Sequence, residues 1–179
     1  MKSFLRDILV TFVLAAVIYL GLRTTIQTFS VNGPSMEPNF YYGQRLVVNK
    51  IAYKVSNPQR GDVIVFHSLN GRPGDYIKRV IGLPGESVEI RDGKVYIHKV
   101  DGSVITLTEP YIKEPVRGTF KGQKIPEDHY FVMGDNRNNS GDSRESWTLP
   151  REDIVGRAWV TVWPPDRMGP APNYHFQPL

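Results

Sequence analysis

An uncharged apolar run near the N-terminus is the feature that most constrains this chain. The fifteen residues from Ile8 to Leu22 carry no charged side chain. Inside a bilayer every backbone polar group must be paired within the segment, so such a run must be helical there. Fifteen helical residues span ~22 Å, which is short of a hydrocarbon core of ~30 Å. Flanking apolar residues and snorkelling arginines make up the difference, namely Phe4, Leu5, Ile26 and Phe29 with Arg6 and Arg23.

The same run is also compatible with a cleavable secretion signal. Lys2 and Arg6 form a basic start, and the run has the length of the apolar region of such a signal. Residues 23–27, however, offer no small-x-small cleavage site directly after the run. The sequence therefore favours a retained single-span anchor. Because basic residues flank the run on both sides, charge alone does not determine its orientation.

From Gln44 onward the pattern changes to alternation with period two, which predicts strands. Residues 91–93, Arg-Asp-Gly, are typical of a hairpin turn. A polar stretch at 108–128 predicts a long surface excursion, and the last dozen residues predict an extended tail. The expected strands lie at 46–48, 63–66, 76–81, 87–90, 94–97, 104–107, 130–133 and 158–163.

These patterns predict two parts in the chain. Residues 1–28 are expected to form an N-terminal tip and a transmembrane anchor. Residues 29–179 are expected to form a mainly β domain, with a curled or barrel-like antiparallel sheet. Beyond the anchor, no stretch has the pattern of a long amphipathic helix.

Composition excludes several kinds of chemistry. The chain has no cysteine, which excludes thiol catalysis and cysteine-based zinc sites. A net charge of +4 suits an anionic membrane surface or nucleic acid. The basic residues are spread out, however, so nucleic-acid binding is not expected. We expect neither a metal nor a cofactor, because the four histidines share no metal-ligand spacing: His67, His98, His129 and His175.

Ser35 stands between two prolines, Pro34 and Pro38. Each proline restricts its own φ and the conformation of the residue before it, so the segment is stiff. A serine that attacks a carbonyl benefits from such a support, because a misplacement of about 1 Å can cost ~100-fold in rate. An ordinary proline-rich linker is the alternative interpretation of this segment alone.

Lys78 lies inside an expected strand with mostly apolar neighbours. Alternation places it with Tyr76 and Val80 on one face and Arg79 on the other, so each face carries a cation. A solvated strand lysine is one interpretation, and a buried general base beside Ser35 is the other. An unperturbed amine is only ~0.1% neutral near pH 7.4. Burial can lower a lysine pKa by 3–5 units, which is about the shift that a base requires.

The loop at 134–144 is dense in side chains that form hydrogen bonds. An EF-hand calcium loop does not fit, because arginine stands at its third position and serine at its twelfth. An Asn-x-Ser glycosylation sequon at 138–140 matches, although this pattern is short. An ordered turn is a further interpretation, with an ion pair that is either Asp142–Arg144 or Asp135–Arg137.

Five features follow one another along the chain. They are the apolar anchor, Gly-Pro-Ser-Met-x-Pro at 33–38, and the three segments at 60–66, 76–86 and 134–144. In this order the chain resembles the bacterial type I signal peptidases, Ser/Lys endopeptidases that remove signal peptides from exported proteins. The resemblance extends from the anchor to residues 155–158.

The resemblance implies roles for individual residues. Ser35 matches the nucleophile, and its backbone N–H matches part of the oxyanion hole. Lys78 matches the general base, and Ser140 matches the serine that orients the lysine amine. Further residues match the supporting loop and its ion pair, namely Asp135, Asn136, Arg137, Asp142 and Arg144.

The resemblance also implies a location and a substrate. It implies a bacterial cytoplasmic membrane, one span with a cytoplasmic N-terminus, and a catalytic domain on the outer face. The implied partners are membrane lipid and preproteins with signal peptides, cut after small-x-small (Ala-x-Ala-like) sites. The substrate would lie extended along an exposed strand edge.

The sequence departs from the family pattern in three places. Gly33 stands where some relatives have a hydroxyl that serves the oxyanion hole. Asn39-Phe40 replaces the usual Thr-Leu, and Trp147 stands where glycine is expected. These departures leave Ser35 and Lys78 unaffected.

Two other classes of protein are alternatives to a signal peptidase. A self-cleaving Ser/Lys repressor would need an N-terminal DNA-binding domain, where this chain has the apolar run. A membrane-tethered β domain that binds partners without catalysis would tolerate replacement of Ser35 and Lys78.

Overall fold

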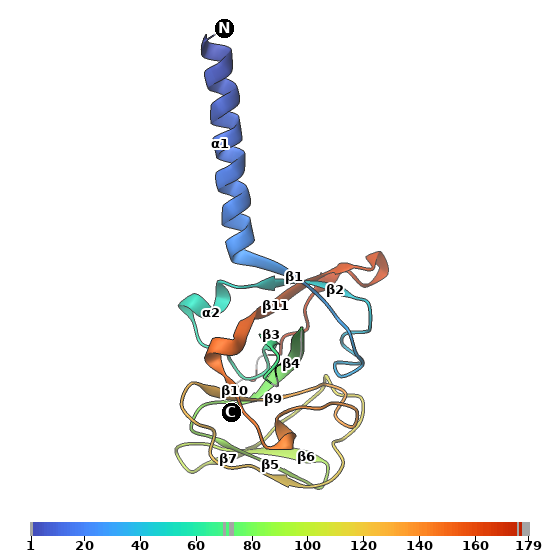
Figure 1. Cartoon of the computed structure of the whole chain (residues 1–179). Coiled ribbons are helices and arrows are strands. Elements are labelled where there is room, and N and C mark those ends of the chain that lie inside the picture. The colour runs from blue at the N-terminus through green and yellow to red at the C-terminus, as the bar shows by residue number, and fades with distance from the viewer. Residues whose placement is uncertain (1, 70, 72–73, 175, 177–179) are drawn as a thin grey trace.

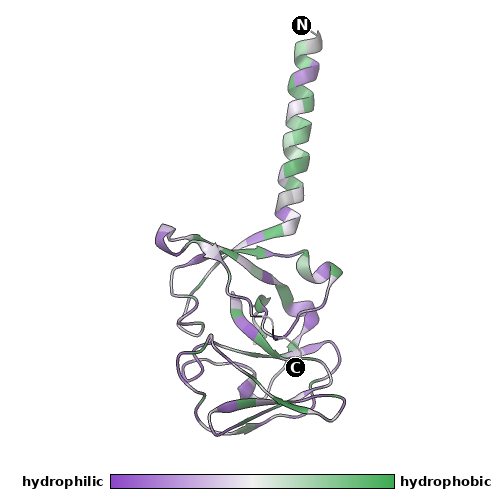
Figure 2. Cartoon of the chain, turned by 180° about the vertical axis from the view of Figure 1, so that it is seen from behind, coloured by the Kyte–Doolittle hydropathy of each residue, from purple (hydrophilic) through white to green (hydrophobic). Residues whose placement is uncertain are grey.

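The N-terminal helix projects away from a β-rich body (Figure 1). The computed structural model describes residues 2–69, 71, 74–174 and 176. Helix α1 (Lys2–Thr25) has 24 residues and therefore a length of ~36 Å. Its segment Phe4–Thr25 has a mean hydropathy of 2.0 and, among the described residues, is the one helix long and apolar enough to cross a membrane. The apolar colouring continues along the helix in Figure 2.

The larger sheet has eight strands, which pair with one another in antiparallel fashion. Strand β1 begins directly after α1, so the helix is joined to the edge of this sheet without a linker. In spatial order the strands are β1 (Ile26–Ser30), β2 (Arg45–Asn49), β11 (Ile154–Trp163), β3 (Val63–His67), β4 (Asp75–Gly82), β9 (His129–Met133) and β10 (Leu149–Pro150), with β12 (Gly169–Pro170) on β11.

A second sheet of four strands lies at the end of the body farthest from α1 (Figure 1). Its order is β7 (Val104–Thr106), β6 (Lys94–His98), β5 (Ser87–Arg91) and β8 (Phe120–Lys121). Asp92 and Gly93 both have positive φ, as a two-residue hairpin turn requires, so the expected hairpin is confirmed. The mainly antiparallel β fold is confirmed as well, and neither sheet closes into a barrel among the described residues.

Short helices complete the fold. Helix α2 (Ala52–Val55) follows β2, and three 3-10 turns lie late in the chain. These are η1 (Ser143–Glu145), η2 (Arg151–Asp153) and η3 (Pro165–Arg167). All of these helices are short, as expected from a sequence that has no long amphipathic pattern after the anchor.

Strand β4 is buried on both faces at its C-terminal half. Val80 and Ile81, which point to opposite faces, have no exposed surface. Consequently both cations of this strand are buried, with Lys78 at 5% and Arg79 at 0% exposure. The interpretation of Lys78 as a solvated strand lysine is therefore wrong.

Two segments pack on the core, the stretch 108–128 that was expected to be a surface excursion and the C-terminal segment that was expected to be an extended tail. Within residues 108–128, the side chains of Tyr111, Val116 and Ile125 are buried, and β8 joins the second sheet. Near the C-terminus, Ala171 is buried beyond strand β12. In both segments a few apolar residues among many polar ones suffice to hold the chain against the body, a pattern too sparse for periodicity to reveal.

Asn173 provides a test of the packing of the C-terminal segment. Its Oδ1 accepts a bond from the backbone of Val63 at 2.8 Å, and its Nδ2 donates to the carbonyl of Ala158 at 2.9 Å. We expect Asn173→Ala to lower the free energy of unfolding by ~1–3 kcal/mol, because buried backbone groups lose their partners. Thermal unfolding of the full chain in detergent measures this, and Asn57→Ala, at an exposed asparagine, is the control. Equal melting temperatures for the two variants would contradict this packing.

Candidate active site

The side chains of Ser35 and Lys78 meet in a direct hydrogen bond. The Lys78 Nζ lies 2.7 Å from the Ser35 Oγ and 3.1 Å from the carbonyl oxygen of Ile77. Lys78 extends from β4, whereas Ser35 lies in the turn that connects β1 and β2. The two residues are 43 positions apart in sequence, so only the sheet brings them together.

The turn that carries Ser35 is held by two buried side chains. Met36 and Phe40 have no exposed surface, and the backbone N–H of Phe40 donates to the carbonyl of Met36 at 2.9 Å. The Glu37 N–H also donates to the carbonyl of Pro34 at 3.1 Å. Because apolar anchors and backbone bonds fix this turn, the nucleophile candidate has a rigid support, unlike a serine in a loose linker.

Burial changes the protonation of Lys78. Loss of solvation lowers the pKa of its amine from 10.5 to about 8, while the carboxylates of Asp142 and Asp135 act in the opposite direction. At pH 7.4 an amine with such a pKa is neutral in roughly a fifth of the molecules, instead of ~0.1% for an unperturbed lysine. The site therefore holds a usable fraction of free amine next to a hydroxyl.

The loop after β9 is bonded to the backbone around Ser35. The N–H of Asn136 donates to the carbonyl of Ser35 at 3.0 Å, and its Nδ2 donates to the carbonyl of Pro34 at 3.1 Å. A Cβ on Gly134 would lie 2.3 Å from the Ser140 Oγ and 2.4 Å from the Ser35 carbonyl oxygen. Glycine at 134 is therefore what allows the Ser140 side chain and the Ser35 backbone to approach each other.

Ser140 lines the same cavity as Ser35 and Lys78. Its Oγ is buried and has no hydrogen-bond partner in the described part of the chain. Its backbone carbonyl accepts a bond from Arg144 at 3.2 Å, which fixes the main chain at this point. A direct bond from Ser140 to the lysine amine is thus not among the contacts of this structure.

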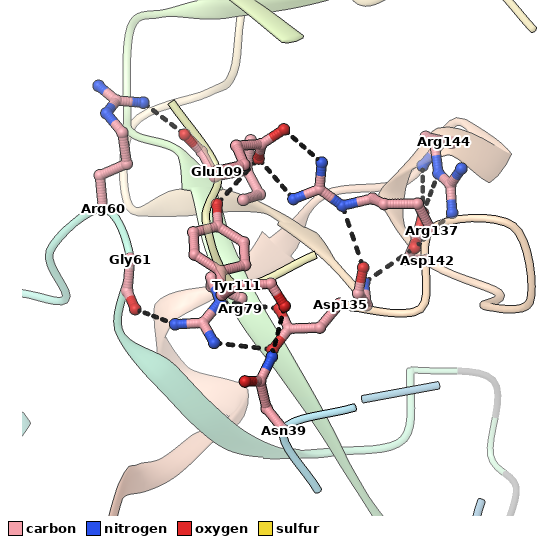
Figure 3. A network of polar contacts seen from close by, with 12 residues as sticks. Asn39, Arg60, Gly61, Arg79, Glu109, Tyr111, Asp135, Arg137, Asp142 and Arg144 are labelled. Atoms are coloured by element: carbon pink, nitrogen blue, oxygen red, sulfur yellow. Dashed lines mark hydrogen bonds and ion pairs between the residues drawn. The ribbon is translucent and has the colours of Figure 1, made fainter. Parts of the chain in front are cut away.

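Arg79, the neighbour of Lys78 on the opposite face of β4, forms a buried bidentate ion pair (Figure 3). Its guanidinium donates to the two carboxylate oxygens of Asp135 at 2.8 and 2.7 Å, and both side chains are fully buried. The same guanidinium donates to the carbonyl of Gly61 at 2.8 Å and lies over the Tyr111 ring at 4.1 Å. This charge therefore remains compensated, and the Asp135 loop is tied to β4.

The two ion pairs considered for the loop have different outcomes. Asp142 does bond Arg144, at 2.7 and 2.9 Å, and it also accepts from the backbone of Gly134 at 3.0 Å. Asp135, however, pairs with Arg79 and not with Arg137. The Arg137 guanidinium instead forms a bidentate pair with Glu109, at 2.6 and 2.5 Å.

Sequence reasoning missed three members of this network, Asn39, Glu109 and Tyr111 (Figure 3). The Asn39 Nδ2 donates to Asp135 at 2.8 Å and to the carbonyl of Tyr111 at 2.7 Å. Asn39 thereby links the turn that carries Ser35 to the loop after β9. The departure from the usual Thr-Leu at residues 39–40 was a signal that could have pointed to Asn39. Glu109 lies in a polar stretch that has no recognisable pattern.

A cavity of about 500 Å³ opens beside the Ser35–Lys78 pair. Its lining includes strand β4 from Asp75 to Lys78 and residues 139–141 of the loop after β9. Strand β9 pairs with β4 from Arg79 onward, so within the described residues one edge of Asp75–Lys78 has no strand partner. Within the described part of the chain, no cluster of three or more His, Cys, Asp or Glu side chains could hold a metal.

The chain is similar to known peptidases over most of its length. Residues 5–163 match the family described as "Signal peptidase, peptidase S26". A signal peptidase I of Leptolyngbya laminosa is 41% identical over 175 residues, covering 90% of this chain and 82% of the relative. The signal peptidase IB of Staphylococcus aureus strain MRSA252 is 33% identical over 199 residues, covering 99% of this chain and 97% of the relative.

A solved structure agrees with these matches. The crystal structure of a signal peptidase I from Enterococcus faecalis V583 aligns with a TM-score of 0.50 and 33% identity. The alignment covers 57% of this chain and 97% of that structure. The fold and the matches define the class of protein as a peptidase. More specifically, the chain belongs to the signal peptidase family, peptidase S26.

Gly134 provides a test of the site geometry. We expect Gly134→Ala to force Ser140 and the Ser35 backbone apart, because Cβ contacts below 3.0 Å are essentially never seen. Overpacking of this kind typically costs ~1–3 kcal/mol. Thermal unfolding in detergent should therefore show a lower melting temperature. Gly169→Ala is the matched control, since a Cβ there meets nothing within 4 Å. If both variants melt with the parent, the close approach at Gly134 does not exist.

Proposed function

We propose that this chain is a membrane-anchored serine endopeptidase that removes N-terminal signal peptides from exported preproteins, cutting after small-x-small sites. Ser35 is the nucleophile and Lys78 the general base. The observation that carries this proposal is the 2.7 Å contact between the Ser35 hydroxyl and a buried amine whose pKa is lowered to about 8. Family membership supports the same conclusion.

The proposed reaction proceeds in two stages. The neutral Lys78 amine takes the proton from the Ser35 hydroxyl while the oxygen attacks the scissile carbonyl. As the C–N bond breaks, the ammonium returns that proton to the leaving amine, and the signal peptide remains as an ester on Ser35. The same amine then takes a proton from water, which attacks the ester, and the regenerated ammonium protonates the departing Ser35 oxygen.

The backbone N–H of Ser35 is the first donor to the oxyanion. Gly33 has no side-chain donor, so a second donor must come from elsewhere in the site. Asn136 supports the first donor indirectly, since it donates to the carbonyl of Ser35 at 3.0 Å and so fixes this peptide segment. In this proposal Asn136 therefore contributes by orienting the backbone N–H of Ser35.

Ser140 and the loop ion pairs act as positioning residues in the proposal. The Ser140 Oγ lines the cavity and is free to bond the amine when Lys78 changes its protonation state. The pairs Arg79–Asp135 and Arg144–Asp142 hold the loop that carries Ser140 and Asn136. Arg137 extends this support to Glu109.

The proposed topology combines the direct junction of α1 and β1 with the orientation that the resemblance implies. We assign α1 to the anchor, with its N-terminus in the cytoplasm, and the chain from β1 onward to a catalytic domain on the outer face of a bacterial cytoplasmic membrane. Ser35 is ten residues beyond Thr25, the end of α1, which is at most ~35 Å of extended chain. The site therefore lies close enough to the bilayer for a substrate whose apolar segment is still embedded.

The unpaired edge of Asp75–Lys78 supports an extended substrate. A peptide added there would form backbone hydrogen bonds with β4 and pass Lys78 at the cut. Residues 139–141 line the same cavity and would contact the bound peptide in this proposal.

Removal of either member of the Ser35–Lys78 pair tests the proposal. We expect Ser35→Ala and Lys78→Met each to reduce preprotein cleavage by at least about 1,000-fold, because neither residue alone can form the activated nucleophile. The assay uses the purified full chain in detergent and follows the processed product by gel and mass spectrometry. Ser30→Ala and Lys121→Met, at exposed positions, are the matched controls.

Two outcomes would overturn the proposal in different ways. Cleavage by both variants at the parental rate would exclude Ser35 and Lys78 as catalytic residues. A parent that is inert on several preproteins would favour the non-catalytic tethered domain.

The pH dependence of cleavage tests the protonation of Lys78. The active form is the neutral amine, so kcat/KM should rise about tenfold per pH unit below pH 8 and level off above it. The free energy of unfolding should also rise with pH. In the unfolded chain Lys78 keeps its proton up to about pH 10.4, whereas in the folded chain it loses the proton above about pH 8. The folded state is therefore increasingly favoured as pH rises from 8 to 10. A profile measured from pH 6 to 10 with a midpoint near 10 would show that the amine is not desolvated.

A further inference from the structure

Glu145 brings an unpaired carboxylate to the cavity that contains Ser35 and Lys78. It is the last residue of η1 and is exposed to solvent. Among the residues that the structure describes, its carboxylate takes part in no hydrogen bond or ion pair. The carboxylates of Asp135 and Asp142, by contrast, are each bonded to an arginine. A negative charge at the cavity is therefore available to a bound substrate.

The carboxylate of Glu145 lies over the backbone of Gly141. A Cβ on Gly141 would be 2.9 Å from the Glu145 Oε1, so the lack of a side chain there allows this close approach. Gly141 itself lines the cavity. A second cavity, of about 410 Å³, shares Ser140 and Glu145 with the first one. Because Glu145 lines both cavities and is exposed, its carboxylate lies at the rim where they adjoin.

The turn that carries Glu145 is fixed to β9. Ser143, the first residue of η1, is buried, and its Oγ accepts a bond from the backbone N–H of Val132 at 3.0 Å. The Glu145 N–H donates to the carbonyl of Asp142 at 2.9 Å. Desolvation lowers the pKa of Lys78, and the Glu145 carboxylate is one of the charges that act in the opposite direction. The carboxylate is therefore held within electrostatic reach of the position at which a peptide would be cut.

The end of the cavity at Asp75 lies next to the anchor. The Nε2 of Gln27 donates to Asp75 at 3.3 Å, and Gln27 belongs to β1, which begins directly after α1. In the proposed function the apolar segment of the substrate precedes the cut and is embedded in the membrane. The residues before the cut would therefore lie along β4 from Lys78 toward Asp75, in the cavity that Glu145 lines.

An extended peptide points successive side chains to opposite sides. The two small residues of a small-x-small site, P1 and P3, are the first and third residues before the cut. In the proposed function they face into the cavity, so P2, the residue between them, points out toward its rim. The Glu145 carboxylate lies at that rim, and a lysine or arginine side chain at P2 is long and flexible enough to reach it.

We propose that Glu145 is a specificity-determining residue, whose carboxylate binds a basic side chain, lysine or arginine, at P2 of the substrate. This inference rests on the proposed function. The attraction is electrostatic, so a neutral side chain at P2 is bound less well and an acidic one is disfavoured. The selection acts on the charge of the middle residue and leaves the requirement for two small residues unchanged.

The experiment compares preproteins that differ only at P2, which carries Lys, Gln or Glu. The parent should cleave the Lys substrate with a kcat/KM about two- to fivefold above that of the Gln substrate, as for an ion pair at an exposed site. The Glu substrate should be cleaved more slowly than the Gln substrate by a similar factor. At about pH 9 a P2 lysine remains charged, because its pKa is near 10.4. Added salt at about 1 M should reduce both ratios, because it screens exposed charges.

Two replacements of Glu145 test the role of its charge. Glu145→Gln should bring the three substrates to about equal kcat/KM, and Glu145→Lys should reverse their order. Both variants lose a charge that raises the pKa of Lys78, so the pH midpoint of cleavage should move down for every substrate. This common shift cancels in the ratios between substrates.

Glu127→Gln and Glu127→Lys are the matched controls. Glu127 is exposed and is not among the residues that line either cavity. We expect the P2 ratios of both control variants to equal those of the parent.

Three outcomes would overturn the inference. The first is equal cleavage of the three substrates by the parent, or parental P2 ratios in both Glu145 variants. The second is a change of charge selectivity at P1′, the first residue after the cut, without one at P2. The third is a uniform loss on every substrate in both variants, which would show that Glu145 only holds the loop.

Ser35→Ala separates this inference from the proposed function and is measured on the same substrates. If it is inactive while the Glu145 variants retain the parental ratios, only the specificity inference fails. If Ser35→Ala still cuts, the proposed function fails.

Discussion

The structure depends on the burial of two neighbouring cations on opposite faces of β4. The Arg79 guanidinium is compensated by Asp135, which accepts two hydrogen bonds from it. Among the residues that the structure describes, Lys78 has no carboxylate partner of its own and bonds the Ser35 hydroxyl and a backbone carbonyl. Of the three carboxylates that raise its pKa, the two with the largest effect, on Asp142 and Asp135, are each bonded to an arginine. Desolvation therefore prevails at Lys78, and a free amine becomes accessible.

The same ion pairs determine the shape of the site. Asp135 accepts from both Arg79 and Asn39, so one carboxylate joins β4, the loop after β9 and the turn of Ser35 (Figure 3). Asp142 accepts from the backbone of Gly134 and so closes that loop at its other end. Because these groups are buried and paired, loss of one partner would leave an uncompensated charge, which is strongly destabilising. The groups that compensate the buried charges are therefore the same groups that fix the geometry of the Ser35–Lys78 pair.

Much of the fold was predictable, because strands with period-two alternation and a hairpin turn carry local signals. The strands around 46–48, 63–66 and 76–81 were expected, and the structure contains them. Segments held by few contacts were not predicted correctly. The polar stretch at 108–128 contributes Tyr111 and Glu109 to the site, and the C-terminal segment packs through Asn173. Neither has a repeating pattern, because single side chains and not a continuous face hold them.

The sequence by itself determined the apolar helix, the antiparallel β class and the residue types of the site, because these depend on local periodicity and on motifs. Only the tertiary structure decided which charges are paired. Asp135 and Arg137 are two residues apart, yet each bonds a distant partner, Arg79 and Glu109 respectively. It also decided that Lys78 is buried, since a strand pattern identifies two faces without showing that both are covered. Desolvation is a property of the surrounding chain, and sequence spacing does not contain it.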